Sequence, residues 1–145
     1  METTFADMTA ELTQDVSERL KSDRYIWLTT VAKSGQPVPR LVWFYFDGKD
    51  LTVYSMPNAA KVAHIKAHPR VSLNLDSDGG GGGVVAVGGE ARIDAVDADP
   101  IADAQYQAKY HDYAVSMGMT EEFLAAFNTR LKIGIDKVWT TPSAE

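Results

Sequence analysis

The chain contains no cysteine, and this excludes several kinds of site. Disulfides, zinc sites built on thiolates and cysteine nucleophiles all require a thiol. Histidine is scarce as well, with 3 residues. His64 and His68 lie four positions apart on one predicted helix, but no glutamate accompanies them as in a metalloprotease motif. We therefore predict no metal site.

Long hydrophobic runs and an excess of basic residues are also absent. No apolar segment approaches the roughly 20 residues that span a bilayer. The N-terminal stretch METTFADMTAELTQD lacks the apolar core of a signal peptide. The net charge of −6 and the pI near 5.0 argue against nucleic acid as a partner, because phosphate binding needs a basic surface. We expect a cytoplasmic protein that binds neither membranes nor nucleic acids.

The patterns that are present predict one compact unit of mixed structure. A length of 145 residues is typical of a single domain, which we predict over residues 1–145. Segments rich in β-branched and aromatic residues predict strands at 25–31, 38–46, 51–55, 71–75, 84–93 and 131–141. Because the helical segments do not alternate regularly with these strands, we predict an α+β fold with six antiparallel strands in a barrel and short helices outside.

Four helices are predicted from apolar spacing and capping residues. In the first helix Met8, Leu12, Val16 and Leu20 recur every fourth residue, with Thr9 as the predicted N-cap. The other helical segments are 59–68, 100–113 and 120–128.

Glycine marks the predicted turns and irregularities. Gly35 predicts a turn after the first strand, and Gly88-Gly89 predicts a bulge or sharp bend within a later strand. The glycine run 79–83 lacks the Lys and Ser/Thr of a P-loop, so by itself it favours a flexible hairpin. Glycines beside a strand also allow a ligand to approach the backbone closely.

The segment from Leu51 to Leu75 contains no Asp or Glu, although the whole chain is acidic. The residue pattern of this segment predicts a strand that ends at Ser55, followed by a tight turn and then a helix. Lys61 lies in the first turn of that helix. A cation is unfavourable there, because the start of a helix carries partial positive charge. Free backbone N–H groups, the Ser55 hydroxyl and the Lys61 ammonium can converge on one phosphate. The alternative is that Lys61 is simply exposed.

An ordered set of short motifs resembles the split β-barrel flavin and deazaflavin proteins, the superfamily that includes pyridoxamine 5′-phosphate oxidase. The motifs are Gly35-Gln36-Pro37, Val42-Trp43-Phe44, Tyr54-Ser55, Lys61 with Ile65, Pro69 to Leu73, Gly89-Glu90-Ala91, Lys109-Tyr110 and Met119 to Phe123. They extend over nearly the whole chain. They are most similar to the actinobacterial branch that uses the deazaflavin coenzyme F420.

This resemblance implies a six-stranded antiparallel split β-barrel that forms a homodimer, with two cofactor sites at the subunit interface. In such a site Ser55 and Lys61, with Ala60 beside it, would hold the cofactor phosphate. The second strand and the start of the strand after the glycine run would line the cofactor. These lining residues are Pro39, Arg40, Leu41, Val42, Gly82, Gly83 and Val84.

The activity implied by the resemblance is that of an oxidoreductase, which transfers a hydride from reduced F420 to a small organic acceptor. Two departures from the FMN-binding oxidases favour F420 over FMN. Arg40 is not followed by the lysine that those proteins carry on the second strand, and Ala60 replaces the arginine before their helix lysine. His64 replaces an asparagine that is frequent in deazaflavin relatives, and we expect it at the cofactor. No residue is singled out as a catalytic acid.

Two alternatives remain open from the sequence. One is an FMN-dependent oxidase or reductase of the same fold. The other is a flavin-binding or haem-binding module without enzymatic activity, with His64, His68 and His111 as candidate haem ligands.

Overall fold

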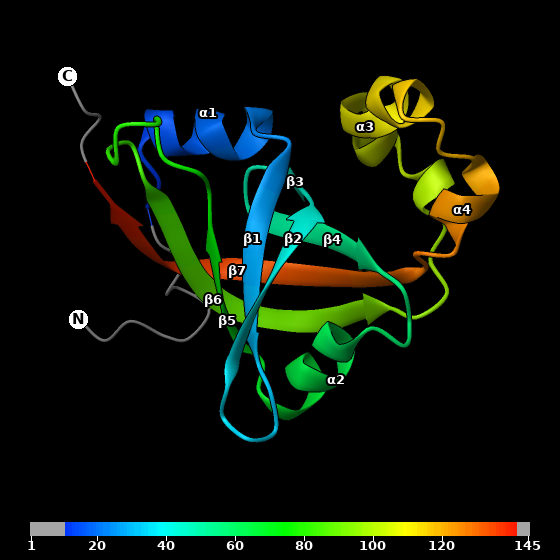
Figure 1. Ribbon diagram of the computed structural model, residues 1–145, viewed down its shortest axis with the longest axis horizontal. Helices are drawn as coiled ribbons and strands as arrows, with labels where there is room; N and C mark the ends of the chain where they lie inside the picture. The colour runs from blue at the N-terminus through cyan, green and yellow to red at the C-terminus, as the bar shows by residue number, and fades with distance from the viewer. Residues whose placement is uncertain (1–10, 142–145) are drawn as a thin grey trace.

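The computed structural model describes residues 11–141, and its strands form one antiparallel sheet that curls into a half-barrel (Figure 1). The strands are β1 (Tyr25–Val31), β2 (Pro37–Trp43), β3 (Tyr45–Phe46), β4 (Asp50–Ser55), β5 (Arg70–Asn74), β6 (Val85–Ala95) and β7 (Thr129–Thr140). They are arranged in the order β2-β1-β5-β6-β7-β4-β3. The prediction of an antiparallel curled sheet is confirmed, but the sheet has 7 strands and not six.

The additional strand arises because the predicted strand over 38–46 breaks at Phe44. The Phe44 N–H donates to the hydroxyl of Tyr110 over 2.8 Å, and the Phe44 carbonyl accepts from Lys109 Nζ, also over 2.8 Å. Side chains of helix α3 (Ala104–Ser116) therefore satisfy the backbone groups that a neighbouring strand would otherwise pair. The local sequence favours a continuous strand, but contacts from α3, a helix far along the chain, interrupt it at Phe44.

Two helices lie at opposite ends of the curled sheet (Figure 1). Helix α1 (Gln14–Ser22) has Thr13 as its N-cap, whose hydroxyl accepts from the Val16 N–H over 3.2 Å. The predicted cap Thr9 and the predicted helical residue Met8 lie outside the described residues, and Leu12 precedes the helix. Helix α2 (Ala60–Ala67) is one residue shorter at each end than its prediction.

The predicted helix over 100–113 is interrupted at Asp103. A short 3-10 helix, η2 (Pro100–Ala102), precedes this residue and α3 follows it. Asp103 Oδ1 accepts from the N–H groups of Gln105 and Tyr106, so it caps α3. Helix α4 (Glu121–Ala125) begins after the N-cap Thr120. Together α3 and α4 lie to one side of the sheet (Figure 1).

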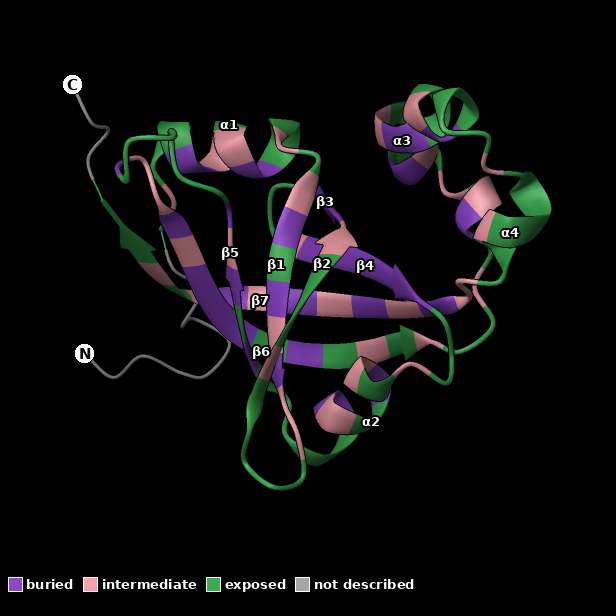
Figure 2. Cartoon of the chain, viewed as in Figure 1, coloured by how far each residue is buried: buried purple, intermediate pink, exposed green. Residues whose placement is uncertain are grey.

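The inner face of the curled sheet carries the main hydrophobic core, seen as buried stretches on the strands in Figure 2. Its fully enclosed members include Leu20, Leu28, Phe44, Leu51, Leu73 and Ile133. A second, smaller cluster is aromatic and joins α3 to β3 and β4. It consists of Tyr45, Tyr54, Tyr106 and Tyr110.

The predicted irregularity at Gly88-Gly89 is confirmed, because the pairing register of β6 with β7 shifts between these two residues. A Cβ atom on Gly89 would lie 1.7 Å from the carbonyl oxygen of Gly134 on β7. The close approach of the two strands therefore requires glycine here. Within residues 11–141, no helix is long and apolar enough to cross a membrane.

Candidate functional site

A pocket of about 250 Å³ opens beside the start of α2 and contains the predicted anion-binding lysine, Lys61. Its other walls are apolar or aromatic and come from β2, β4 and the region of α4. The lining residues are Leu41, Val42, Trp43, Tyr54, Lys61, Met119, Phe123, Leu124 and Phe127. We call this the Lys61 pocket.

Lys61 is a half-buried cation without an anionic partner. No hydrogen bond or ion pair joins its ammonium group to any other residue between 11 and 141. Burial, and then the positive charge of Arg40, lower the pKa of Lys61 below its ordinary value. An anion in the pocket would reverse both effects, since it would pair with the ammonium and offset Arg40.

The start of α2 adds further hydrogen-bond donors beside this cation. The N-cap position is Ala59, which has no side chain able to bond the first N–H groups, and the first turn contains no acidic residue. The first backbone N–H groups of a helix have no partner within it. Ala60 is exposed there, so the helix start and Lys61 present positive charge in the same place.

Two other predicted residues surround Lys61 in different ways. His64 is half-buried one turn along α2, and its Nδ1 lies 2.8 Å from the hydroxyl of Thr30 on β1. Arg40 is exposed on β2, where Nη1 donates to the carbonyl of Pro39 over 3.1 Å. Arg40 lies close enough for its charge to act on Lys61, whereas the bond of His64 holds its ring against β1.

Ser55 is placed less favourably for contact with a ligand. It is the last residue of β4 and is fully buried, with 0% of its surface exposed. Its hydroxyl donates to the carbonyl of Met56 over 2.9 Å. The hydroxyl would have to become exposed and change its partner before it could bind a phosphate.

Behind the pocket, two tyrosines converge on one carboxylate. The hydroxyls of Tyr54 and Tyr45 donate to Asp103 Oδ2 over 2.6 and 2.8 Å. Burial raises the pKa of Tyr45 to about 12 and raises that of Tyr54 further, so both remain protonated donors. Burial opposes ionisation of Asp103, but the bonds from Tyr54, Tyr45 and the helix N–H groups outweigh it and lower the pKa of Asp103.

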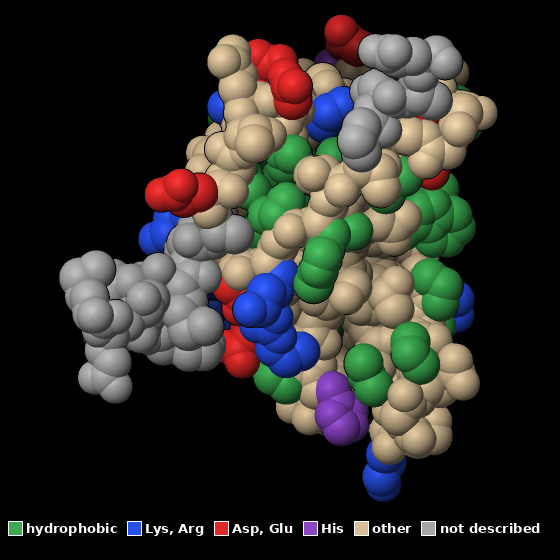
Figure 3. All heavy atoms as spheres, turned by 90° about the vertical axis from the view of Figure 1, so that its left-hand side faces the viewer, with side chains coloured by type: hydrophobic (Ala, Val, Ile, Leu, Met, Phe, Trp, Pro, Cys, Tyr) green, Lys and Arg blue, Asp and Glu red, His purple; other side chains and the backbone are tan. Residues whose placement is uncertain are grey.

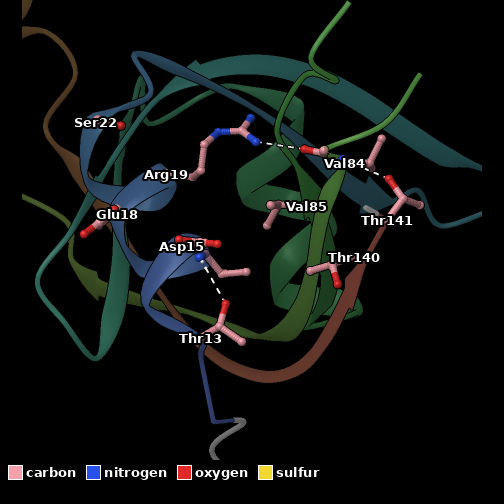
Figure 4. Close-up of a pocket in the computed structure, with 11 residues that line it drawn as sticks. Thr13, Asp15, Glu18, Arg19, Ser22, Val84, Val85, Thr140 and Thr141 are labelled. Atoms are coloured by element: carbon pink, nitrogen blue, oxygen red, sulfur yellow. Dashed lines mark hydrogen bonds between the residues drawn. The ribbon is translucent and has the colours of Figure 1, made fainter. Parts of the chain in front are cut away.

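The predicted residues of the glycine run lie elsewhere, in a larger cavity of about 480 Å³ (Figure 4). Gly83 and Val84 line this cavity together with α1 and the end of β7. Arg19 donates to the carbonyl of Gly83 over 2.8 Å, and the Val84 N–H donates to the Thr141 hydroxyl over 3.0 Å. These bonds connect the end of the run to α1 and to Thr141, which follows β7.

Within one chain, the predicted cofactor-binding residues do not line a single cavity. The Lys61 pocket contains Leu41 and Val42, while Gly83 and Val84 lie in the second cavity, and the two share no described lining residue. Gly82 is buried in the same loop, where its N–H donates to Asp78 over 3.2 Å. In Figure 1 this loop lies beside α1, away from α2.

The aromatic wall of the Lys61 pocket, formed by Phe123 on α4 and Phe127 after it, was not predicted from the sequence. Phe123 and Phe127 lie 5.4 Å apart between ring centroids and both line the pocket. The predicted helix over 120–128 would place both rings on one face, but α4 ends at Ala125 and Phe127 lies in the segment before β7. Their meeting at the pocket therefore depends on tertiary packing.

A row of exposed side chains crosses the sheet on the face opposite the core. The register pairs Leu41 with Trp27, Trp27 with Asn74, Asn74 with Ala86, and Ala86 with Trp139. Directly paired residues point to the same face. Leu41, Trp27 and Trp139 expose 48%, 36% and 56% of their surface. Hydrophobic side chains are also visible at the surface in the space-filling view of Figure 3.

The last feature of the site concerns metal ligands. Among the residues that the structure describes, no group of three or more His, Cys, Asp or Glu side chains could hold a metal ion.

Comparison with known proteins places the chain in a recognised family. The family model for pyridoxamine 5′-phosphate oxidase matches residues 12–133. No curated protein matches the sequence. An F420 reductase structure superposes with a TM-score of 0.67 at 20% identity, covering 88% of this chain and 98% of that one.

Two further structures share the fold. General stress protein 26 from Bacillus anthracis has a TM-score of 0.64 at 18% identity, covering 87% of this chain and 90% of that one. The haem storage protein HutZ from Vibrio cholerae has a TM-score of 0.59 at 12% identity, covering 88% and 91%. At these identities the likeness concerns the fold alone.

Proposed function

Because the chain belongs to the pyridoxamine 5′-phosphate oxidase family, we propose that it is an oxidoreductase that uses the deazaflavin coenzyme F420. When bound in reduced form, this coenzyme supplies a hydride to a small organic acceptor. The proposal also rests on an F420 reductase of the same fold. The FMN-dependent alternative would use the same pocket and is separated from it by the experiment below.

The observation that carries the proposal is the unpartnered Lys61 ammonium at the rim of an apolar pocket. F420 has an anionic phosphate and a flat aromatic ring system, and the pocket offers a matching cation and aromatic walls. Lys61 and the N–H groups at the start of α2 would bind the phosphate. Leu41, Val42 and Trp43 would pack against the rest of the molecule and exclude water from it.

We further propose that two copies of the chain complete each site. The Lys61 pocket, at about 250 Å³, falls below the roughly 300–1,000 Å³ typical of ligand sites. The glycine loop lies too far away to line it within one chain, so a second copy would have to supply it. The exposed row with Leu41, Trp27 and Trp139 offers an apolar surface for that contact. Sedimentation of a monomer at the concentrations used for binding would contradict this part of the proposal.

The proposal is tested by titrating the protein separately with oxidised F420 and with FMN, following quenching of Trp27, Trp43 and Trp139. We expect saturable binding of F420 in preference to FMN. Replacing Lys61 with Ala should weaken F420 binding by about 10- to 100-fold, which corresponds to about 1.5–3 kcal/mol for a hydrogen bond to a charged group.

The matched control is Lys66→Ala, because Lys66 is exposed on the same helix one turn beyond the pocket. It removes the same charge from α2 and should leave the affinity within about twofold. An equal loss of F420 affinity in both variants would mean that binding depends only on the overall charge of α2. Unchanged affinity in Lys61→Ala would refute the assignment of Lys61, and preferential binding of FMN would assign the protein to the oxidase branch.

A haem-binding module is the second candidate, and one contact favours it. The bond between His64 Nδ1 and Thr30 leaves Nε2 of His64 available as a ligand, and HutZ, a haem storage protein, has the same fold. Under this alternative, haem added to the protein gives a Soret band that His64→Ala abolishes and His68→Ala preserves.

A further inference from the structure

A second partly buried lysine, Lys109, lies in a pocket of its own. This pocket has a volume of about 350 Å³ and shares no described lining residue with the Lys61 pocket. It is formed between α1, β3 and α3. The lining residues are Lys21, Tyr45, Phe46, Gln105, Ala108 and Lys109.

The ammonium of Lys109 is held by neutral groups. Its Nζ donates to the carbonyl of Phe44 over 2.8 Å and lies 3.8 Å from the centroid of the Phe44 ring and 5.3 Å from that of Tyr110. No carboxylate forms an ion pair with it among residues 11–141. These contacts favour the ammonium form of Lys109, and only its burial opposes that form.

The charged groups around this pocket act in opposite directions. Burial lowers the pKa of Lys109 to about 8, and the carboxylate of Asp23 counteracts it only in part. Lys21, exposed on α1, lines the same pocket and adds a second positive charge. Tyr45 also lines it, but its hydroxyl is bonded to Asp103. At neutral pH the pocket thus combines an amine that is partly free with a nearby cation.

From this arrangement we propose that Lys109 is a site of covalent acylation by small anionic acyl donors, such as acyl phosphates, and that Lys21 attracts the donor into the pocket. In this reaction the neutral Nζ attacks the acyl carbon and a C–N bond forms. The bond between that carbon and the phosphate oxygen breaks, phosphate leaves with the electron pair, and the extra proton on Nζ passes to solvent. The proposal is independent of the coenzyme that the protein binds.

Acylation of Lys109 would change a contact that shapes the sheet. A neutral amide cannot make the cation–π contact with the Phe44 ring. Phe44 is the residue at which the strand breaks between β2 and β3, and Trp43 beside it lines the Lys61 pocket. The modification therefore acts on the segment Trp43-Phe44, which connects the two pockets.

The test is to treat the purified full-length protein with acetyl phosphate at pH 7.5 and to measure acetylation at each lysine by peptide mass spectrometry. A pKa near 8 leaves about a quarter of Lys109 as free amine, against less than about 1% for an ordinary lysine. Allowing for the lower intrinsic reactivity of a less basic amine, we expect Lys109 to react at least about tenfold faster than the exposed Lys66.

Two controls separate the parts of the proposal without requiring a change at Lys109. Lys21→Gln should slow the reaction of Lys109 with acetyl phosphate several-fold, but not its reaction with an uncharged acetylating ester. Raising the pH from 8 to 9.5 should increase the rate at Lys109 only about twofold, because a pKa near 8 already leaves about half of its amine free at pH 8. Acetylation of Lys109 no faster than that of Lys66 would overturn the proposal, and equal slowing with both reagents would overturn the role of Lys21.

Discussion

Two partly buried charges near Tyr54, on Asp103 and on Lys61, differ in their hydrogen-bond partners. Asp103 receives hydrogen bonds from the hydroxyls of Tyr54 and Tyr45 and from two backbone N–H groups. The Lys61 ammonium donates none to the described residues and lies near a like charge on Arg40. Burial opposes ionisation in both cases, but only the carboxylate has partners that outweigh this cost.

The difference separates a charge that stabilises the fold from a charge that is available to a ligand. Asp103 joins β3, β4 and α3, so its ionised form holds three elements together. Lys61 joins nothing, so its ionised form costs free energy until an anion binds. Substitutions at the two positions should therefore change stability in opposite directions, and this expectation can be tested in four ways.

The largest effect is expected from Asp103→Ala, which removes the helix cap and leaves two buried tyrosine hydroxyls without an acceptor. We expect a loss of about 3 kcal/mol in the free energy of unfolding, measured by urea denaturation. Asp112→Ala removes a carboxylate from an exposed position on the same helix and should change stability by less than about 0.5 kcal/mol. A similar small effect at Asp103 would show that its network does not stabilise the fold.

The same network predicts a pH dependence. Because the folded state lowers the pKa of Asp103, the stabilisation is fully present above its unfolded pKa of about 3.9 and is lost as the pH falls through the folded value. The stability difference between the wild type and Asp103→Ala should thus be constant from pH 5 to 7 and shrink below about pH 4. A difference that persists undiminished into strong acid would point to packing rather than to the ionised carboxylate.

A smaller effect is expected from Tyr54→Phe, which removes one donor and keeps the bond from Tyr45. The expected loss is about 1 kcal/mol, the usual contribution of one hydrogen bond. Combining it with Asp103→Ala should add less than its separate effect, because the bond is already absent. Full additivity in a double-mutant cycle would show that the two side chains do not interact.

The smallest effect, and the only one of opposite sign, is expected from Lys61→Met. This change removes the buried charge but keeps a side chain of similar length. Without a ligand it should raise the free energy of unfolding by a few tenths of a kcal/mol, since the half-exposed ammonium is partly screened. Differential scanning calorimetry measures it. A clear loss of stability would mean that Lys61 has an internal role and would weaken the comparison with Asp103.

Local patterns predicted most of the secondary structure, and long-range contacts explain the failures. Strand β1, helix α2 and the shift at Gly88-Gly89 follow from residue types within a few positions. The break at Phe44 does not, because it depends on Tyr110 and Lys109 in a helix far along the chain. The helix over 100–113 was predicted as one element because the capping role of Asp103 becomes visible only once its partners are known.

For the candidate site, too, the features that depend on local sequence were predicted and those that depend on tertiary packing were not. The absence of acids around Lys61 was a local property of the sequence, and it identified a cation that lacks a partner in the described part of the fold. The burial of Ser55 could not be predicted from the sequence, since it depends on the strands that pack around β4. The aromatic wall formed by Phe123 and Phe127 and the separation of the glycine loop from α2 likewise depend on how distant segments meet.

The pairing of β4 with β7 also has a consequence for the time course of folding. Asp50 pairs with Gly134 and Ser55 with Thr129, so this seam joins segments from distant parts of the chain. Such contacts pay the largest loop-closure entropy and form slowly. Tyr54 lies on one side of the seam, and Phe127, just before β7, on the other, and both line the Lys61 pocket. The pocket therefore becomes complete only when the seam closes, so a ligand bound there would stabilise the folded state but would not accelerate the step that forms the pocket.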